Sequence, residues 1–182
     1  MREENRGVKK MNKRILGSNI DFRAYGDTAA AINNTLEDGM LLSTLCEKTG
    51  VEASTVQNWV KRGYLSKPDG KKYSAEQAAE VIILNNLKHT VQLDEASAYM
   101  NEVKDNSGIA SVDILAVLSS SLIRATRFNS IDRASLESVI NIEMRSFGIG
   151  EKEVAKLLLI SALSALCADY KAYAQKEFAG EK

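Results

Sequence analysis

The sequence predicts a mainly all-α protein in which a helix-turn-helix unit with a short basic turn precedes a C-terminal helical bundle. Its 182 residues include one proline and few aromatic residues, and good helix formers such as Leu, Ala, Glu and Lys are common. Apolar residues recur at spacings of three and four along most of the chain, which is the pattern of amphipathic helices. Two of these helices are so short that they need to pack against each other and a third helix to be stable in water.

A formal net charge of zero gives the chain no general attraction to nucleic acid or membrane. The two cysteines, Cys46 and Cys167, lie far apart without a partner motif, which disfavours a disulfide framework and fits a reducing cytoplasm. Residues 1–14 are polar and charged, unlike a secretory signal, and the longest apolar run in the C-terminal half, 157–160, is too short to span a bilayer. We expect a soluble, cytoplasmic protein with no membrane partner.

Three regions are expected along the chain. Residues 1–20 mix basic and polar types and predict a basic, flexible tail, with a phosphate-binding arm as the alternative. Residues 21–105 form the expected helix-turn-helix domain, which opens with a weak helical pattern at 21–34. Residues 106–182 form the expected helical region for dimerisation or effector sensing.

Two short helices are predicted next to each other. One face of the first carries the apolar side chains of Leu42, Leu45 and Cys46. This helix stops at Gly50, and the second, residues 53–62, stops at Gly63. The second presents apolar residues at i, i+3 and i+4, namely Val56, Trp59 and Val60. Two short helices joined through a glycine are typical of a helix-turn-helix arrangement.

A turn and a capped helix follow. Asp69-Gly70 is a turn dipeptide whose flanks are expected to pair as a minimal β-hairpin, giving a wing at residues 66–73. Ser74 opens the next helix, and Gln77 three residues later completes a capping box. That helix is expected to run to about Leu87.

The remainder of the chain is predicted to be helical. The expected helices span 94–103, before a breaker at 105–108, and then 109–127, 131–147 and 151–178. The last helix carries a stripe at steps of four and three, made of Leu159, Leu163, Leu166, Tyr170 and Tyr173. Such a stripe is interpreted either as core or as a coiled-coil-like dimer seam.

Charge is uneven within the neutral chain. Between Gln57 and Tyr73 there is one acid, Asp69, against five basic residues, which are Lys61, Arg62, Lys67, Lys71 and Lys72. Cations clustered on one surface are what phosphate binding needs. The second helix also presents polar side chains away from its apolar face, at Ser54, Thr55, Gln57 and Asn58. Their amides and hydroxyls are suited to hydrogen bonds with base edges in the major groove. The alternative interpretation is that this polar, basic face is merely solvated.

The stretch from Leu42 to Met100 resembles the DNA-binding half of MerR-type regulators in the order of its residues. The parallel comprises Leu42, Leu45 and Cys46, Thr49-Gly50-Val51, Thr55-Val56, Trp59, Gly63-Tyr64-Leu65, Pro68 and Lys72-Tyr73-Ser74. The resemblance implies a MerR-like winged helix-turn-helix fold, duplex DNA as ligand, and homodimers that bind two half-sites. In that family a basic wing residue and the following tyrosine approach phosphates, and Lys71, Lys72 and Tyr73 occupy those places.

Three departures from the MerR pattern leave base preference, dimer geometry and promoter twisting open. Gln57 and Asn58 stand where those proteins usually carry arginine and tyrosine. The wing is short, and the C-terminal part lacks the standard single long dimerisation helix.

Residues 54–100 resemble more closely a family of uncharacterised proteins from Gram-positive bacteria, catalogued as a domain of unknown function. The hallmark of that resemblance is residues 58–68 together with Lys71-Lys72-Tyr73-Ser74.

These patterns predict a DNA-binding transcriptional regulator with recognition helix 53–62 and wing 66–73. The C-terminal helices would then form a homodimer or enclose an unidentified small-molecule effector. One alternative is a helical protein-interaction or scaffold module without DNA binding, motivated by the zero net charge and the substituted recognition positions. Another is an architectural or excisionase-like DNA binder without effector sensing.

No enzymatic activity and no cofactor are predicted. The sequence has no phosphate-cradling glycine loop, nucleophile elbow or helix-borne zinc motif. The single histidine, His89, is expected to face solvent or cap a helix end. One histidine and two separated cysteines disfavour a metal site, and Cys46 and Cys167 are both expected in the core.

Overall fold

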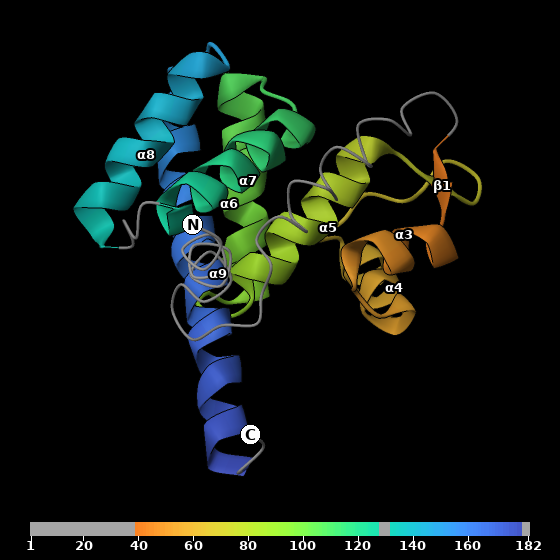
Figure 1. Cartoon of the computed structure of the whole chain (residues 1–182). Helices are drawn as coiled ribbons and strands as arrows, with labels where there is room; N and C mark the ends of the chain where they lie inside the picture. The colour runs from red at the N-terminus through yellow and green to blue at the C-terminus, as the bar shows by residue number, and fades with distance from the viewer. Residues whose placement is uncertain (1–38, 128–131, 180–182) are drawn as a thin grey trace, which may run out of the picture.

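The computed structural model describes residues 39–127 and 132–179, and these confirm the mainly helical class (Figure 1). The elements follow in the order β1 (Met40–Leu41), α3 (Leu42–Thr49), α4 (Ala53–Arg62), β2 (Lys72–Tyr73), α5 (Ala75–Leu87), α6 (Leu93–Ser107), α7 (Ser111–Arg127), α8 (Arg133–Ser146) and α9 (Lys152–Ala179). The expected tail at 1–20 and the weak helical pattern at 21–34 lie outside the described residues.

The two short helices end where the sequence predicts. Gly50 follows α3 with a φ of 67°, and Gly63 follows α4 with a φ of 81°. Their backbone N–H groups donate to carbonyls of the last helical turn, which satisfies acceptors that a helix end leaves free. A Cβ built at either position meets nothing within 4 Å. The left-handed backbone, and not a lack of space, therefore favours glycine here.

The small sheet differs from the expected hairpin. β2 pairs antiparallel with β1, which precedes α3, so that Met40 faces Tyr73 and Leu41 faces Lys72. The segment before the turn is engaged elsewhere, because the carbonyls of Ser66 and Lys67 accept hydrogen bonds from the Gln77 side chain on α5. The Asp69-Gly70 turn is present, closed by the Lys72 N–H on the Asp69 carbonyl at 2.9 Å. The prediction that β2 pairs with the segment directly before the turn was wrong, because its partner is β1.

Helix α5 lies at the centre of the molecule. It contacts α3 on one side and α6, α7 and α9 on others, and 11 of its 13 residues are buried. One continuous cluster of buried side chains extends from Leu45 and Trp59 in the short helices to Leu115 in α7 and Leu157 in α9. The core therefore has no break at the expected domain boundary between 105 and 106.

Most helix bounds in the C-terminal half agree with the expected ones to within about two residues, and one does not. The breaker at 105–108 was expected to end the helix at Val103, but α6 continues to Ser107. The Ser107 hydroxyl donates to the Val103 carbonyl at 2.7 Å, and Gly108 provides the left-handed end with a φ of 65°. Polar residues that bond their own last turn lengthen this helix instead of stopping it.

Side-chain hydrogen bonds and ion pairs connect the helices outside the apolar core. The Glu80 carboxylate on α5 lies 2.5 Å from the Lys104 ammonium on α6. Arg124 on α7 pairs with Glu143 on α8, and the Thr90 hydroxyl bonds that of Ser164 on α9. Both basic partners are more than two-fifths exposed, so each ion pair contributes little compared with apolar burial.

The long helix α9 leaves the core part-way along its length (Figure 1). Leu166 is 5% exposed and Tyr170 is 45% exposed, so the predicted stripe is core at its start and surface further on. Cys167 is exposed and Cys46 is half-buried. The prediction that Cys167 lies in the core was wrong, because the helices that cover Leu166 do not reach the face that carries it. Within the described residues no single helix is long and apolar enough to cross a membrane, and only α6 with the first part of α7, bent by 109°, passes that test as a pair.

Replacing Trp59 with alanine is expected to lower the free energy of unfolding by about 3–5 kcal/mol, because this ring is 1% exposed in the core. Urea denaturation followed by circular dichroism measures the change. Gln57→Ala, on the exposed face of the same helix, is the matched control and is expected to stay within about 0.5 kcal/mol. A similar small effect for Trp59→Ala would contradict the burial of the ring.

Candidate nucleic-acid interface

Helix α4 has one apolar and one polar face. Val56 and Trp59 point into the core and are 0% and 1% exposed. The opposite face is exposed at Ser54, Gln57, Asn58, Lys61 and Arg62, while Thr55 is half-buried at its edge. This division follows from the helical period, since the buried residues are three apart. The polar residues singled out from the sequence are therefore accessible to a large partner.

The basic residues after α4 are also at the surface. Lys67, Lys71 and Lys72 are exposed, as is the acid between them, Asp69. Figure 1 places α3, α4 and the segment leading to β2 at one end of α5, away from α8. In the described part of the chain none of the five cations on α4 and the wing has an ion-pair partner. Without a direct ion pair, their charge is available to an anion at the surface.

Tyr73 differs from the other nine predicted site residues because it is 5% exposed. It belongs to the hydrophobic core through its place in β2 opposite Met40. Burial raises the pKa of its phenol, and the nearby Cys46 adds to this effect. The structure thus gives Tyr73 a packing role, in contrast to the phosphate contact that the resemblance implied. The alternation of the strand places Lys72 outward and Tyr73 inward.

The side chains of Tyr64 and Asp94 form a contact chain with Arg62 at the C-terminal end of α4. Its guanidinium lies 4.9 Å from the ring centroid of Tyr64, within the range of a cation–π interaction. The Tyr64 hydroxyl donates to the Asp94 carboxylate in the first turn of α6, at 2.5 Å. This hydrogen bond is the main cause of a raised pKa of Tyr64. Sequence analysis missed this group, because Tyr64 and Asp94 are 30 positions apart and Asp94 has the pattern of an ordinary helix-terminal acid.

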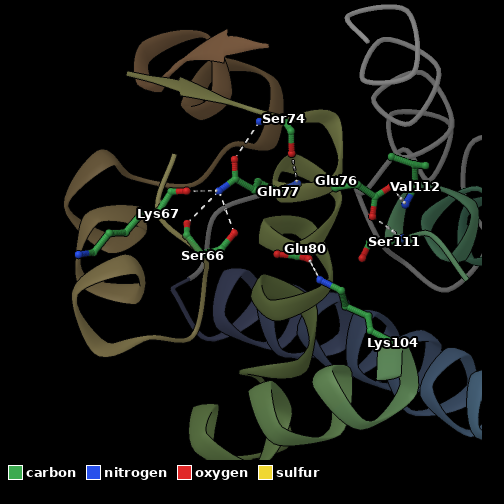
Figure 2. Close-up of polar contacts among 9 residues, drawn as sticks. All are labelled: Ser66, Lys67, Ser74, Glu76, Gln77, Glu80, Lys104, Ser111 and Val112. Atoms are coloured by element: carbon green, nitrogen blue, oxygen red, sulfur yellow. Dashed lines mark hydrogen bonds and ion pairs between the residues drawn. The ribbon is translucent and has the colours of Figure 1, made fainter. Parts of the chain in front are cut away.

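Gln77, a member of the predicted capping box at the start of α5, also attaches the wing to this helix (Figure 2). The Ser74 hydroxyl accepts from the Gln77 N–H at 3.2 Å, and the Gln77 side-chain oxygen accepts from the Ser74 N–H at 2.9 Å. The Gln77 amide nitrogen also reaches the wing, where it donates to the carbonyl of Ser66. The capping box is confirmed, while the contact with the wing has no local sequence signal.

Besides Asp69 on the wing, two further acidic groups limit the positive surface. Glu52 is exposed and precedes the first residue of α4, where a carboxylate interacts favourably with the helix dipole. Asp94 lies next to Tyr64 at the other end. The five cations lie at the last turn of α4 and on the wing, and Asp94 and Asp69 partly offset their charge there.

In residues 39–127 and 132–179 no three His, Cys, Asp or Glu side chains gather to hold a metal ion. His89 is exposed after the end of α5, and desolvation together with Lys88 and Lys171 lowers its pKa. What the exposed groups of α4 and the wing can do is donate hydrogen bonds and attract anions.

Residues 27–116 match the family model described as a domain of unknown function (DUF1836). The resemblance to a family of uncharacterised Gram-positive bacterial proteins is confirmed. The uncharacterized protein YkrK of Bacillus subtilis (strain 168) is 36% identical over 74 residues, which cover 36% of this chain and 32% of that protein. The chain thus spans about a third of the length of this relative. No solved structure matches.

The family match covers the first part of the described structure and not the last two helices. The matched residues include β1, α3, α4, β2, α5 and α6 in full, and they end within α7. The candidate interface therefore lies inside the family region. Helices α8 and α9 lie outside the match, although they share its core.

Asp94→Asn is expected to move the pKa of Tyr64 down toward its usual value of 10.0, because the charged acceptor of its hydroxyl is lost. A raised pKa in the folded state means that this hydrogen bond stabilises the fold below pH 10 and is lost as the pH rises through the raised value. NMR titration of ring-labelled tyrosine measures the shift, with Tyr64→Phe identifying the resonance. Tyr99, whose pKa is raised mainly by burial, is the internal control. An unchanged Tyr64 titration would contradict the hydrogen bond.

Proposed function

We propose that this chain is a transcriptional regulator that binds duplex DNA through α4 and the wing. The observation that carries the proposal is the exposed polar face of α4, which continues into cations that have no ion-pair partner among residues 39–127 and 132–179. A short amphipathic helix whose apolar side is fixed in a core can present its other side to the major groove. The MerR-like winged helix-turn-helix is part of this proposal.

The exposed residues divide into two roles. Lys61, Arg62, Lys67, Lys71 and Lys72 would contact phosphates, which fixes the position on the duplex without selecting a sequence. Gln57 and Asn58 would contact base edges, since an amide can form paired hydrogen bonds with adenine. Ser54 and the half-buried Thr55 would support these contacts from the first turn of α4.

The assembly proposed is a homodimer in the cytoplasm that binds two half-sites. Two copies of one recognition helix match the two-fold symmetry of a palindromic site. Helices α8 and α9 lie outside the family match, and they would provide the dimer contact or bind an effector.

A protein-interaction module is the second candidate. It is favoured by large apolar side chains at the surface away from α4, since Ile142 and Phe147 are 48% and 45% exposed. A neutral whole-chain charge also fits it. In that case α4 would be a solvated helix of the scaffold.

Selection from a random-sequence duplex pool at two salt concentrations separates these functions. The proposed regulator enriches a palindrome, and its affinity falls steeply as salt rises, because bound cations release counterions from the phosphates. Absence of binding to any duplex at low salt would refute DNA binding and leave the interaction module.

Lys61→Ala and Asn58→Ala are expected to act differently. Lys61→Ala should lower the affinity for cognate and random duplexes alike. It should also reduce the slope of log K against log salt by about 1, because one phosphate contact is lost. Asn58→Ala should cost roughly 1–3 kcal/mol on the cognate site and little on random sequence. Fluorescence anisotropy with labelled duplexes measures both.

The matched control for charge is Lys152→Ala, which removes an exposed cation at the start of α9. It should leave both affinities unchanged. Equal losses on cognate and random duplexes for Asn58→Ala would contradict its role in base contact, and an effect of Lys152→Ala equal to that of Lys61→Ala would contradict a localised site.

A further inference from the structure

Gln77 makes contacts in two directions from the first turn of α5 (Figure 2). Its side chain is buried, with 7% of the residue exposed. Toward the wing, its amide nitrogen lies 2.9 Å from the Ser66 carbonyl oxygen, 3.0 Å from the Ser66 hydroxyl and 3.2 Å from the Lys67 carbonyl oxygen. Toward α5, its amide oxygen accepts from the Ser74 N–H at 2.9 Å.

The orientation of this amide is fixed by the chemistry of its neighbours. A backbone N–H can only donate and a backbone carbonyl can only accept. Reversal of the amide would place its NH₂ against the Ser74 N–H and its oxygen against the two wing carbonyls. Glutamine is therefore suited to this position because it carries a donor and an acceptor on one planar group. Glutamate supplies only the acceptor.

Within the described residues, the backbone of the wing pairs with another strand from Lys72 onward, and the Asp69 bridge closes its own turn. Pro68 restricts the backbone of Lys67 to extended conformations, but it does not fix where that residue lies relative to α4. The hydrogen bonds from Gln77 are the described contacts that hold the Ser66 and Lys67 backbone to a helix.

We propose that Gln77 is a positioning residue for the wing, which holds Lys67 at the place where its ammonium meets the same DNA backbone as the cations of α4. The DNA contact of Lys67 rests on the proposed function, whereas the attachment of the wing by Gln77 does not. The adjacent Glu76 serves a different segment, since its carboxylate accepts from the N–H groups of Ser111 and Val112 at 2.7 and 3.3 Å. Neighbouring residues of one turn thus hold the wing and the start of α7.

Two variants separate the wing contacts from the stability of α5. Gln77→Glu keeps the acceptor for the Ser74 N–H but loses the donors to the wing, whereas Gln77→Met removes both the donors and this acceptor without adding charge. Glu76→Gln is the matched control, because it weakens the contact with α7 and leaves the wing bonds intact. Thermal melts of all three variants establish that each chain is folded.

The first measurement is hydrogen exchange of the backbone amides of residues 66–72 in the protein without DNA. Both Gln77 variants are expected to exchange faster here than the wild type, while residues 53–62 are unchanged and Glu76→Gln matches the wild type in the wing. Unchanged wing exchange in both Gln77 variants would overturn the inference, whatever the protein binds.

The second measurement is a double-mutant cycle on duplex affinity. If Gln77 acts through Lys67, then Gln77→Met lowers the duplex affinity when it is introduced into the wild-type chain. The same substitution causes no further loss of affinity in a chain that already carries Lys67→Ala. Fully additive losses would overturn the positioning role. If the wild type binds no duplex, the proposed function fails, and with it the role assigned to Lys67. The exchange result then still decides whether Gln77 orders the wing.

Discussion

Helix α5 buries 11 of its 13 residues, and the arrangement of the rest of the chain depends on this burial. A helix that carries apolar side chains around most of its circumference has to be covered on most sides. Helix α3 covers one side, with α4 packed against α3, and α6, α7 and α9 cover others. Neither short helix could persist in water alone, so the exposed face of α4 exists only because its other face, with Val56 and Trp59, belongs to the common core. The candidate interface and the C-terminal helices are two parts of one core.

The three polar residues in the first two turns of α5 are compatible with that burial because each has a partner. Glu76, Gln77 and Glu80 occupy the first two turns, and they meet the start of α7, the wing and α6 respectively. A buried polar group without a partner is costly, so these contacts also specify how the neighbouring segments are placed. The apolar part of α5 provides stability, and its polar first turns define geometry.

The features that the sequence predicted well are local ones. The ends of α3 and α4 depend on glycines next to an apolar pattern, and the capping box of α5 depends on two residues three apart. The accessibility of Lys61, Asn58 and their neighbours also follows from helical period. The errors and omissions involve distant partners. β2 pairs with a segment before α3, Tyr64 meets Asp94, and Gln77 meets the wing. Nothing in a window of a few residues distinguishes these partners from others of the same type, because burial and strand pairing are decided by the whole fold.

The pairing of β1 with β2 also acts as a test of correct assembly. Met40 and Tyr73 face each other and are buried, whereas Leu41 and Lys72 face each other at the surface. Because side chains alternate along a strand, a slip of one residue would exchange these two sets. A shifted β2 would carry an ammonium group into the apolar interior and expose a phenol, which is strongly unfavourable. Two residues per strand are thus enough to define the register. The shifted alignment is disfavoured by the free energy of burying a charge, so the register does not depend on the few backbone hydrogen bonds of the sheet.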